Sequence, residues 1–165
     1  MRLTEIILSL SLTTIVTCKS RKAPMAPGSA ADVTRDISNA EKFCKEHGGA
    51  LEVFRVVEGD PVRSCVFGNA RIDLMTLYNA KHSEAVAVFL SGSSDTSPQI
   101  PQLGSPAAAY CQARGGQSKA AYDNDGEFSF CEFSDKSMIE EWTLFRSASS
   151  PDNEKLKAAL TAARS

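Results

Sequence analysis

The stretch AAAYCQARGG at residues 107–116 has a counterpart earlier in the chain, AEKFCKEHGG at residues 40–49. A shift of 67 residues superposes the two stretches. Further identities under the same shift are Gly59 with Gly126, Ile72 with Ile139, Thr76 with Thr143 and Leu77 with Leu144. Two compensating one-residue gaps also align Cys65 with Cys131. Cysteines and paired glycines are uncommon residue types, so the matches indicate that one unit occurs twice.

Both quoted stretches predict a short helix that ends at a glycine pair. Ser105 followed by Pro106 is the arrangement of an N-cap and a first helical residue, and Ser38 with Glu41 forms a capping box at a similar place in the first copy. A glycine is a typical residue just after a helix. We therefore expect one helix at the start of each copy.

A β-hairpin is expected after each helix. Residues 51–57 and 118–122 have the alternating pattern of strands, and an Asp-Gly pair at residues 125–126 is a strong hairpin signal. A second strand then ends at CVF, residues 65–67, or at CEF, residues 131–133. The two copies thus predict equivalent hairpins.

Apolar residues three positions apart close each copy and favour a second short helix, with a strand as the alternative. These residues are Ile72, Met75 and Tyr78 in the first copy and Ile139, Trp142 and Phe145 in the second. Ser137 and Glu140 offer a further capping box. The sequence therefore predicts an α+β fold of two tandem helix-hairpin-helix modules, at residues 38–82 and 105–149.

A unit this small rarely buries enough surface to fold alone, and a disulfide in each copy would compensate. The four cysteines of the two copies permit three pairings. Repeat symmetry favours Cys44 with Cys65 and Cys111 with Cys131, whereas the other two pairings would link the copies. Each such bond is worth about 3 kcal/mol in the chain-entropy account.

Length and composition set broad limits. The chain has 165 residues, 42% of them hydrophobic, and 18 basic residues against 20 acidic ones for a net charge of −2. This composition is typical of a folded globular protein. Without a basic surplus the chain lacks the electrostatic signature of nucleic-acid binding, and we expect no nucleic-acid partner.

The N-terminus has the pattern of a secretory signal peptide over residues 1–17, with an apolar and hydroxyl-rich stretch from residue 6 to residue 16. Cys18 follows directly, where bacterial lipoproteins carry the cysteine that receives the lipid. Five cysteines are an odd number, so one is spare in an oxidising compartment. We therefore expect lipidation at Cys18 and a flexible tether over residues 18–37.

Two segments lie outside the copies. Residues 83–104 are expected to link the modules and include an apolar segment at residues 85–90. Residues 150–165 predict a C-terminal helix that begins near Pro151. The apolar face of that helix comprises Leu156, Ala159, Leu160 and Ala163.

The second copy resembles a known family. Its motifs AAAYC at 107–111, FCEF at 130–133 and EEW at 140–142 resemble those of DUF333, a short domain of bacterial lipoproteins that carry a hemolysin label. The family's second cysteine pair falls at Ile139 and Ser149 here, so both of those cysteines are absent together. The resemblance implies an exported, lipid-anchored, disulfide-stapled module and supports the pairing within the second copy, with residues 38–82 as a degenerate copy.

A candidate binding patch is expected around Trp142. Glu140 and Glu141 are sequence neighbours, so on a helix they would point about 100° apart and could not straddle one substrate bond. With Asp135 they are expected to form a solvated acidic edge. An exposed Trp142 beside Arg146 and these acids has the composition of an interaction hot spot. The alternative is that Trp142 is the core anchor of its copy.

No catalytic residue, cofactor or metal is predicted. The first copy contains four residues of metal-ligand type, which are Cys44, His47, Cys65 and His82. The second copy has Arg114 and Ser149 in the places of the histidines, which argues against a shared metal site.

The expected function is recognition rather than catalysis. The segments above predict an outer-membrane lipoprotein of the bacterial envelope, facing the periplasm or the cell surface, whose modules bind a protein or a cell-wall component. Its contact with the membrane would be through the N-terminal lipid. The alternatives are a membrane-active protein, as the hemolysin label suggests, and a thiol-dependent or metal-dependent enzyme.

Overall fold

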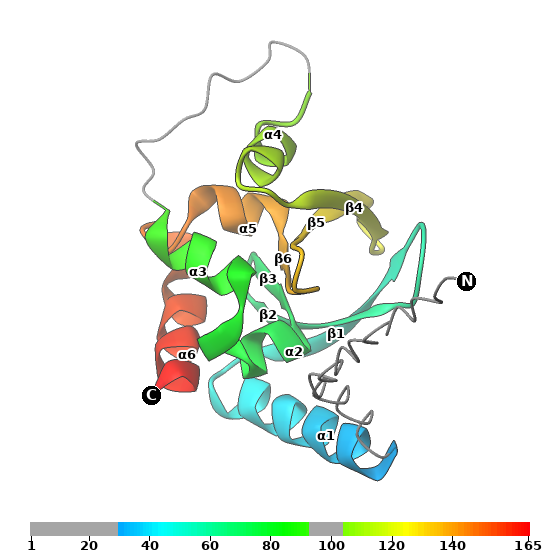
Figure 1. The fold of residues 1–165 in the computed structure, drawn as a ribbon, viewed down its shortest axis with the longest axis vertical. Helices are drawn as coiled ribbons and strands as arrows, with labels where there is room; N and C mark the ends of the chain where they lie inside the picture. Colours follow the sequence, from blue (N-terminus) through cyan, green and yellow to red (C-terminus); the bar gives the residue numbers. More distant parts are fainter. Residues whose placement is uncertain (1–29, 93–103) are drawn as a thin grey trace, which may run out of the picture.

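The computed structural model describes residues 30–92 and 104–165. The strands form one closed antiparallel barrel in the order β1-β2-β3-β6-β5-β4 (Figure 1). The strands are β1 Ala50–Val56, β2 Val62–Phe67, β3 Ala70–Asp73, β4 Gln117–Tyr122, β5 Glu127–Glu132 and β6 Met138–Glu140. The helices are α1 Ala30–Glu46, α2 Leu74–Tyr78, α3 Glu84–Ser91, α4 Pro106–Ala113, α5 Glu141–Arg146 and α6 Glu154–Arg164, with 3-10 turns at Ala80–His82 and Pro151–Asn153.

The prediction of two tandem helix-hairpin-helix modules is wrong. Each copy supplies a meander of three strands, and the copies join at both edges, where β3 pairs with β6 and β1 pairs with β4. The outer strands of a lone meander would present unpaired backbone groups, and pairing with the other copy satisfies part of them. The two copies therefore share a single barrel instead of forming two domains.

The 67-residue shift corresponds to a two-fold relation inside the barrel. Ile72 lies opposite Ile139 where β3 meets β6, and Arg55 lies opposite Tyr122 where β1 meets β4. In both pairs the residues are 67 positions apart, so each faces its own counterpart in the other copy. A two-fold axis through both junctions produces this arrangement, as it does in a symmetric dimer.

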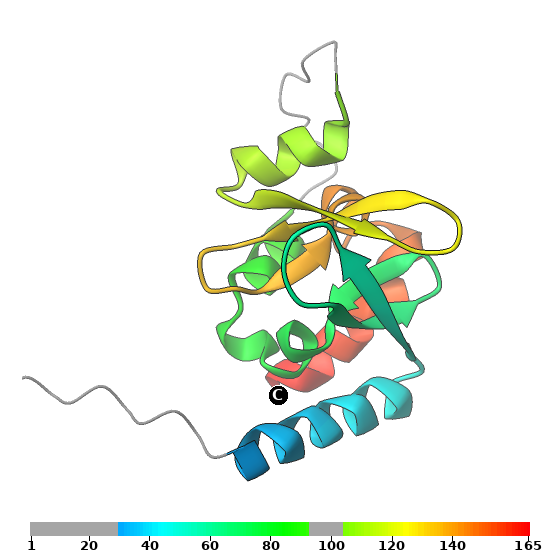
Figure 2. The same ribbon diagram turned by 90° about the vertical axis from the view of Figure 1, so that its right-hand side faces the viewer.

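Two apolar clusters stabilise the fold, one on each face of the sheet. The cluster inside the barrel comprises Phe54, Val62, Val66, Ala121 and Phe130, with Val56, Phe128 and Met138 packed against it. The larger cluster lies between the outer face and the helices, and it includes both disulfides. In Figure 2, α1 and α4 flank the barrel on opposite sides, and no helix lies in front of β1 and the β4–β5 hairpin. Because successive side chains of a strand point to opposite faces of the sheet, each strand contributes residues in turn to the inner cluster and to the outer cluster.

Both predicted disulfides are present. Cys44 on α1 is bonded to Cys65 on β2, and Cys111 on α4 is bonded to Cys131 on β5. The second glycine of each glycine pair is required here, because a Cβ at Gly49 would collide with the sulfur of Cys65, and Gly116 is in the same position beside Cys131. The repeated Cys and Gly-Gly signature is therefore a helix end shaped to admit a disulfide.

The helix starts are only partly as expected. Ser105 caps α4 by accepting a hydrogen bond from the Ala108 N–H at 3.4 Å. In the first copy, α1 begins at Ala30, so Ser38 and Glu41 lie inside the helix and form no capping box. Glu41 forms an ion pair with Arg63 of β2 at 3.2 Å instead. Part of the expected tether, residues 30–37, is thus helical.

The last element of each copy is a strand followed by a short helix. Ile72 and Ile139 belong to β3 and β6, which is the alternative that their spacing left open. Asp73 and Glu140 end these strands and cap α2 and α5 with their side chains. Ser137 and Glu140 form no capping box because β6 separates them.

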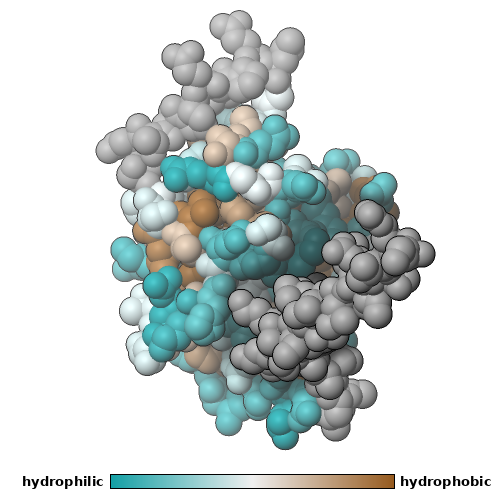
Figure 3. Space-filling model, in the orientation of Figure 1, coloured by the Kyte–Doolittle hydropathy of each residue, from teal (hydrophilic) through white to brown (hydrophobic). Residues whose placement is uncertain are grey.

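The segments outside the copies contribute to the larger cluster. Residues 85–90 of the expected linker belong to α3, whose Ala85, Val86 and Phe89 are fully buried. Figure 3 shows an apolar area over α3, where Val88 and Leu90 are partly buried. The C-terminal helix is confirmed as α6, with its apolar face buried.

The predicted signal peptide at residues 1–17, the predicted lipid site at Cys18 and the linker residues 93–103 lie outside the described residues. Among the helices of residues 30–92 and 104–165, none combines the length and the apolar character needed to cross a bilayer.

Candidate binding cleft

The residues of the predicted binding patch do not form one surface. Trp142 is 43% exposed, whereas Glu140 and Glu141 are each only 4% exposed, so the expected solvated acidic edge is wrong. Asp135 is exposed in the β5–β6 turn, at the far end of β6 from Glu140. Arg146 is half-buried on α5. Of the five residues only Trp142 and Asp135 are exposed, and they lie at opposite ends of β6.

Glu140 holds the two copies together. Its carboxylate accepts a hydrogen bond from the Thr143 hydroxyl at 2.8 Å, and that hydroxyl accepts one from the backbone N–H of Arg71 on β3 at 3.1 Å. The other copy repeats the arrangement, with Asp73 accepting from the Thr76 hydroxyl at 2.9 Å and Thr76 accepting from the Met138 N–H at 2.9 Å. We call these two arrangements the acid–threonine clamps. Each clamp joins a helix start in one copy to a strand of the other.

Glu141 is an unusual buried acid. Burial raises the pKa of its carboxyl, and the Oε1 atom has no hydrogen-bond partner among the described residues. The residue at the same place in the first copy is Leu74, which is 1% exposed. The site is therefore an apolar position of the fold that carries a carboxyl in one copy only.

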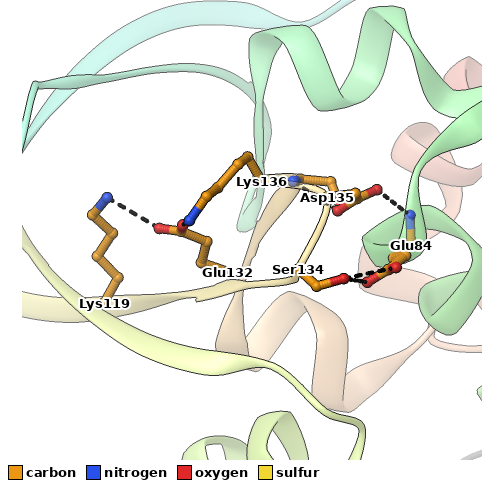
Figure 4. Close-up of polar contacts among 7 residues, drawn as sticks. Glu84, Lys119, Glu132, Ser134, Asp135 and Lys136 are labelled. Carbon is orange, nitrogen blue, oxygen red and sulfur yellow. Dashed lines mark hydrogen bonds and ion pairs between the residues drawn. The ribbon is translucent and has the colours of Figure 1, made fainter. Parts of the chain in front are cut away.

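Asp135 also has a structural role. Its side chain accepts a hydrogen bond from the backbone N–H of Glu84 at 2.8 Å, at the start of α3 (Figure 4). Ser134 donates to the Glu84 carboxylate at 3.0 Å. Partial burial would raise the pKa of Asp135, but the hydrogen bonds from the Glu84 N–H and from the backbone and side chain of Ser137 outweigh it, so this pKa is lowered. The acid anchors α3 to the β5–β6 turn.

The barrel wall is open beside β1. β1 and β4 pair only near their C-terminal ends, at Arg55 with Tyr122 and Val56 with Ala121, extended by a hydrogen bond from the Val57 N–H to the Ala120 carbonyl at 3.1 Å. Before Arg55, the β4 side of β1 has no backbone partner among the residues that the structure describes. β1 therefore leaves a free edge next to the β4–β5 turn.

A cleft of about 700 Å³ occupies this opening. Its lining residues come from β1, β2, β3 and the β4–β5 turn, and they are Glu52, Val53, Phe54, Arg55, Val66, Gly68, Arg71, Tyr122, Asp123, Asn124 and Asp125. The rim is partly apolar, because Val53 is 64% exposed and Tyr122 is 44% exposed. The cleft thus combines exposed apolar side chains with a charged base.

Arg71 forms the base of the cleft. Its guanidinium lies over the Phe128 ring, 4.3 Å from the centroid, and pairs with the Asp123 carboxylate at 2.9 Å. The pKa of Asp123 is lowered, first by the hydrogen bond from the Asp125 N–H and further by Arg71. The arginine is therefore held by an aromatic face and an ion pair, which fixes its position.

A smaller groove of about 410 Å³ lies at the two-fold related place beside β4. It is lined by Val57, Glu58, residues 117–120 and Glu132. Lys119 and Lys136 both bind the Glu132 carboxylate, at 3.1 Å and 2.8 Å (Figure 4). The hydrogen bond from Lys136 is the main cause that lowers the pKa of Glu132, and Lys119 adds to it. Half-buried Ala120 stands here in the place of Val53, and the exposed apolar residue of this groove is Val57, at 60%.

The remaining candidate chemistry involves the cysteines and histidines. Cys44, Cys65, Cys111 and Cys131 are all in disulfides and so are neither nucleophiles nor thiolate ligands. Within residues 30–92 and 104–165, no group of three or more His, Cys, Asp or Glu residues is arranged to hold a metal ion.

Sequence reasoning missed the cleft residues Val53, Arg71 and Tyr122. A signal was present in the sequence, because Val53, Arg55 and Val57 alternate with Phe54 and Val56 and so share one face of the predicted strand at residues 51–57. The pattern alone does not decide whether that face lies in the core or in solvent. Only the position of the other copy shows that no helix covers it.

The chain was compared with family models, curated proteins and solved structures. No curated protein and no solved structure matches it. The model of one family, described as Domain of unknown function (DUF333), matches residues 102–148, a range that contains α4, all three strands of the second copy and α5. Residues 102–148 therefore belong to the DUF333 family.

Proposed function

We propose that this protein is an exported, lipid-anchored binding protein of the bacterial cell envelope, whose ligand is a protein or cell-wall component that docks in the cleft beside β1. The signal-peptide pattern and Cys18 support export and anchoring. Two disulfides in a chain of this size also suit an oxidising compartment.

The cleft is the observation that carries the proposal. Exposed Val53 and Tyr122 supply apolar contact area, and Arg71 supplies a positioned charge and hydrogen-bond donors. Binding sites combine apolar lining with a few fixed polar groups in this way. Because the disulfides and the acid–threonine clamps hold the surrounding strands, little conformational entropy is lost when a ligand binds.

Site-specific photo-crosslinking in cells tests the proposal. A photoreactive phenylalanine analogue replaces Tyr122 in the full chain, and the matched control carries it at Lys157, which is exposed on α6. We expect a discrete adduct from position 122 and none from position 157, and competition by excess unmodified protein. Equal adducts from both positions would contradict a site in the cleft.

The anchor is tested separately. The Cys18→Ser variant should leave the membrane fraction, and the wild-type chain should incorporate radiolabelled palmitate while the variant does not. Dye release from liposomes by the purified full chain would instead favour the membrane-active alternative.

A further inference from the structure

We propose that the free edge of β1 binds an extended segment of a partner protein as an added antiparallel strand, with an apolar residue opposite Val53 and a basic residue opposite Glu52. This inference rests on the proposed function, because it specifies the ligand of the same cleft. Strand addition to a sheet edge is a general mode of peptide recognition, in which backbone hydrogen bonds supply affinity and alternate side chains supply specificity.

The backbone N–H and C=O groups of alternate β1 residues point toward the opening. Hydrogen bonding alternates along a strand, so residues at odd and even positions direct their N–H and C=O groups to opposite sides. Val57 donates its N–H to Ala120 of β4, which places the odd-numbered residues of β1 on the β4 side. Leu51 and Val53 therefore direct their N–H and C=O groups into the opening, where no described residue pairs with them.

A hydrogen-bonded turn at Asp123 keeps β4 from filling the opening. Asp123 Oδ1 accepts hydrogen bonds from the N–H groups of Asp125 and Gly126, at 2.8 Å and 2.9 Å, and the Asp123 N–H donates to the Gly126 carbonyl at 3.0 Å. These bonds turn the chain into β5 directly after Tyr122. The β1 edge is thus left without a partner by a rigid turn.

The pairing of β1 with β4 fixes the register of the added strand. We place the segment so that it continues the line of β4 and runs antiparallel to β1. The pairing of Arg55 with Tyr122 then fixes the next pairs. Three successive residues of the segment lie opposite Phe54, Val53 and Glu52. Arg55 already lies opposite Tyr122, so it does not face the added strand. The segment residue opposite Val53 shares the outer face with exposed Val53 and Tyr122, which favours an apolar side chain.

Charge complementarity supplies the last step. Glu52 and Asp125 are exposed lining residues of the cleft and form no ion pair among the described residues, whereas Arg71 is paired with Asp123. Arg55 also lines the cleft, so three acidic residues stand against two arginines, and the net charge of the lining is negative. A basic side chain opposite Glu52 would meet it, and an acidic one would be repelled.

The test is selection of displayed random nine-residue peptides on the full chain, followed by anisotropy measurements with labelled synthetic copies. We expect selected peptides with an apolar residue followed directly by Lys or Arg. N-methylation of that apolar residue, which removes the N–H that would donate to the Val53 carbonyl, should weaken binding about tenfold or more. Glu52→Lys should weaken it to a similar degree, and a peptide with Glu in place of the basic residue should restore it. Glu58→Lys in the smaller groove is the matched control and should bind like the wild type.

Selected peptides that are insensitive to both N-methylation and Glu52→Lys would overturn the inference, as would the absence of any selected peptide. Neither result would remove a crosslink at position 122, so the proposed function can hold even if the strand-addition inference fails.

Hydrogen exchange distinguishes a partner segment from the two other possible occupants of the edge, another segment of this chain and a second copy of it. The Val53 amide should exchange fast in the peptide-free monomer and slowly with peptide. Protection without peptide would assign the edge to another segment of this chain, and protection that appears only at high protein concentration would assign it to a second copy.

Discussion

The cleft beside β1 and the smaller groove beside β4 are the same part of the barrel in two copies, yet their exposed apolar residues differ. The cleft exposes Val53 and Tyr122 near the Arg71–Asp123 ion pair, whereas the groove exposes Val57 near the Lys119–Glu132 ion pair. The difference begins in the hairpins. In the first copy the last pair before the turn is Phe54 with Val62, and in the second it is Tyr122 with Glu127. The longer β1–β2 connection lets Val57 reach across to Ala120, whereas the short β4–β5 turn withdraws from Val53.

This comparison shows how two equivalent halves of one barrel can present different surfaces. The elements that hold the barrel are repeated in both copies, namely the disulfides, the glycine pairs and the acid–threonine clamps. The side chains that differ, such as Arg71 against Met138 and Leu74 against Glu141, take no part in those repeated bonds, because Arg71 and Met138 enter the clamps only through their backbone N–H groups. The repeated framework keeps its geometry while these positions vary.

The largest test of the two-fold equivalence concerns the disulfides. We expect the Cys44→Ala/Cys65→Ala and Cys111→Ala/Cys131→Ala variants each to lose about 3 kcal/mol of unfolding free energy in urea titrations, because the two bonds close loops of nearly equal length. The sequence separations are 21 and 20 residues. A difference of several kcal/mol between the variants would show that one copy carries most of the stability.

The clamps are tested next. Thr143→Val should cost about 2 kcal/mol, because it removes the partner of the partly buried Arg71 N–H and a buried hydrogen bond to Glu140. Thr76→Val should cost about 1 kcal/mol, since Asp73 is less deeply buried than Glu140 and water can replace part of the loss. Thr→Ser variants at both positions keep the hydroxyl and are the controls. The reverse order of costs would contradict this account.

Glu141 should make the second copy less stable than it could be. We expect Glu141→Leu, which copies Leu74, to stabilise the protein by about 1 kcal/mol at pH 7, because it removes a buried carboxyl without a full set of partners. Burial raises the folded-state pKa of this carboxyl above its usual 4.5, so the folded state holds the proton more tightly than the unfolded state. The contribution of this carboxyl to the unfolding free energy of the wild type therefore falls as pH rises above about 4.5. The stability difference between Glu141→Leu and the wild type should vanish below that pH. A constant advantage at all pH values would rule out titration as its cause.

The smallest effect is expected in the ion pairs of the groove beside β4. Lys136 is 82% exposed, so Lys136→Ala should lower the unfolding free energy least, whereas Lys119→Ala should cost up to about 1 kcal/mol because that pair is more buried. Both costs should shrink in high salt. They should also shrink as the pH falls below the usual carboxyl pKa of 4.5 and through the lowered pKa of Glu132, where its charge is lost. Chemical denaturation at low and high ionic strength measures them, and a salt-independent cost would indicate lost packing instead.

Local signals in the sequence were sufficient for several elements. The Cys and Gly-Gly signature, the two hairpins and the C-terminal helix could be predicted because each depends on neighbouring residues or on rare residue types repeated at one spacing. The third strand was only the alternative to a helix, because β3 and β6 have only four and three residues, too few to show an alternating pattern. The binding patch failed because Glu140 and Glu141 lie at a strand-to-helix junction, where their side chains enter the interior.

The sequence by itself determined the duplication, the disulfide pairing and the order of most local elements, because these follow from residue type and spacing along the chain. Only the tertiary structure decided that the two copies close one barrel and that β1 keeps a free edge. Backbone hydrogen bonds between strands are the same for every residue type, so the sequence does not specify which edges meet. The choice depends on the packing of both copies together, and the cleft is a consequence of that packing.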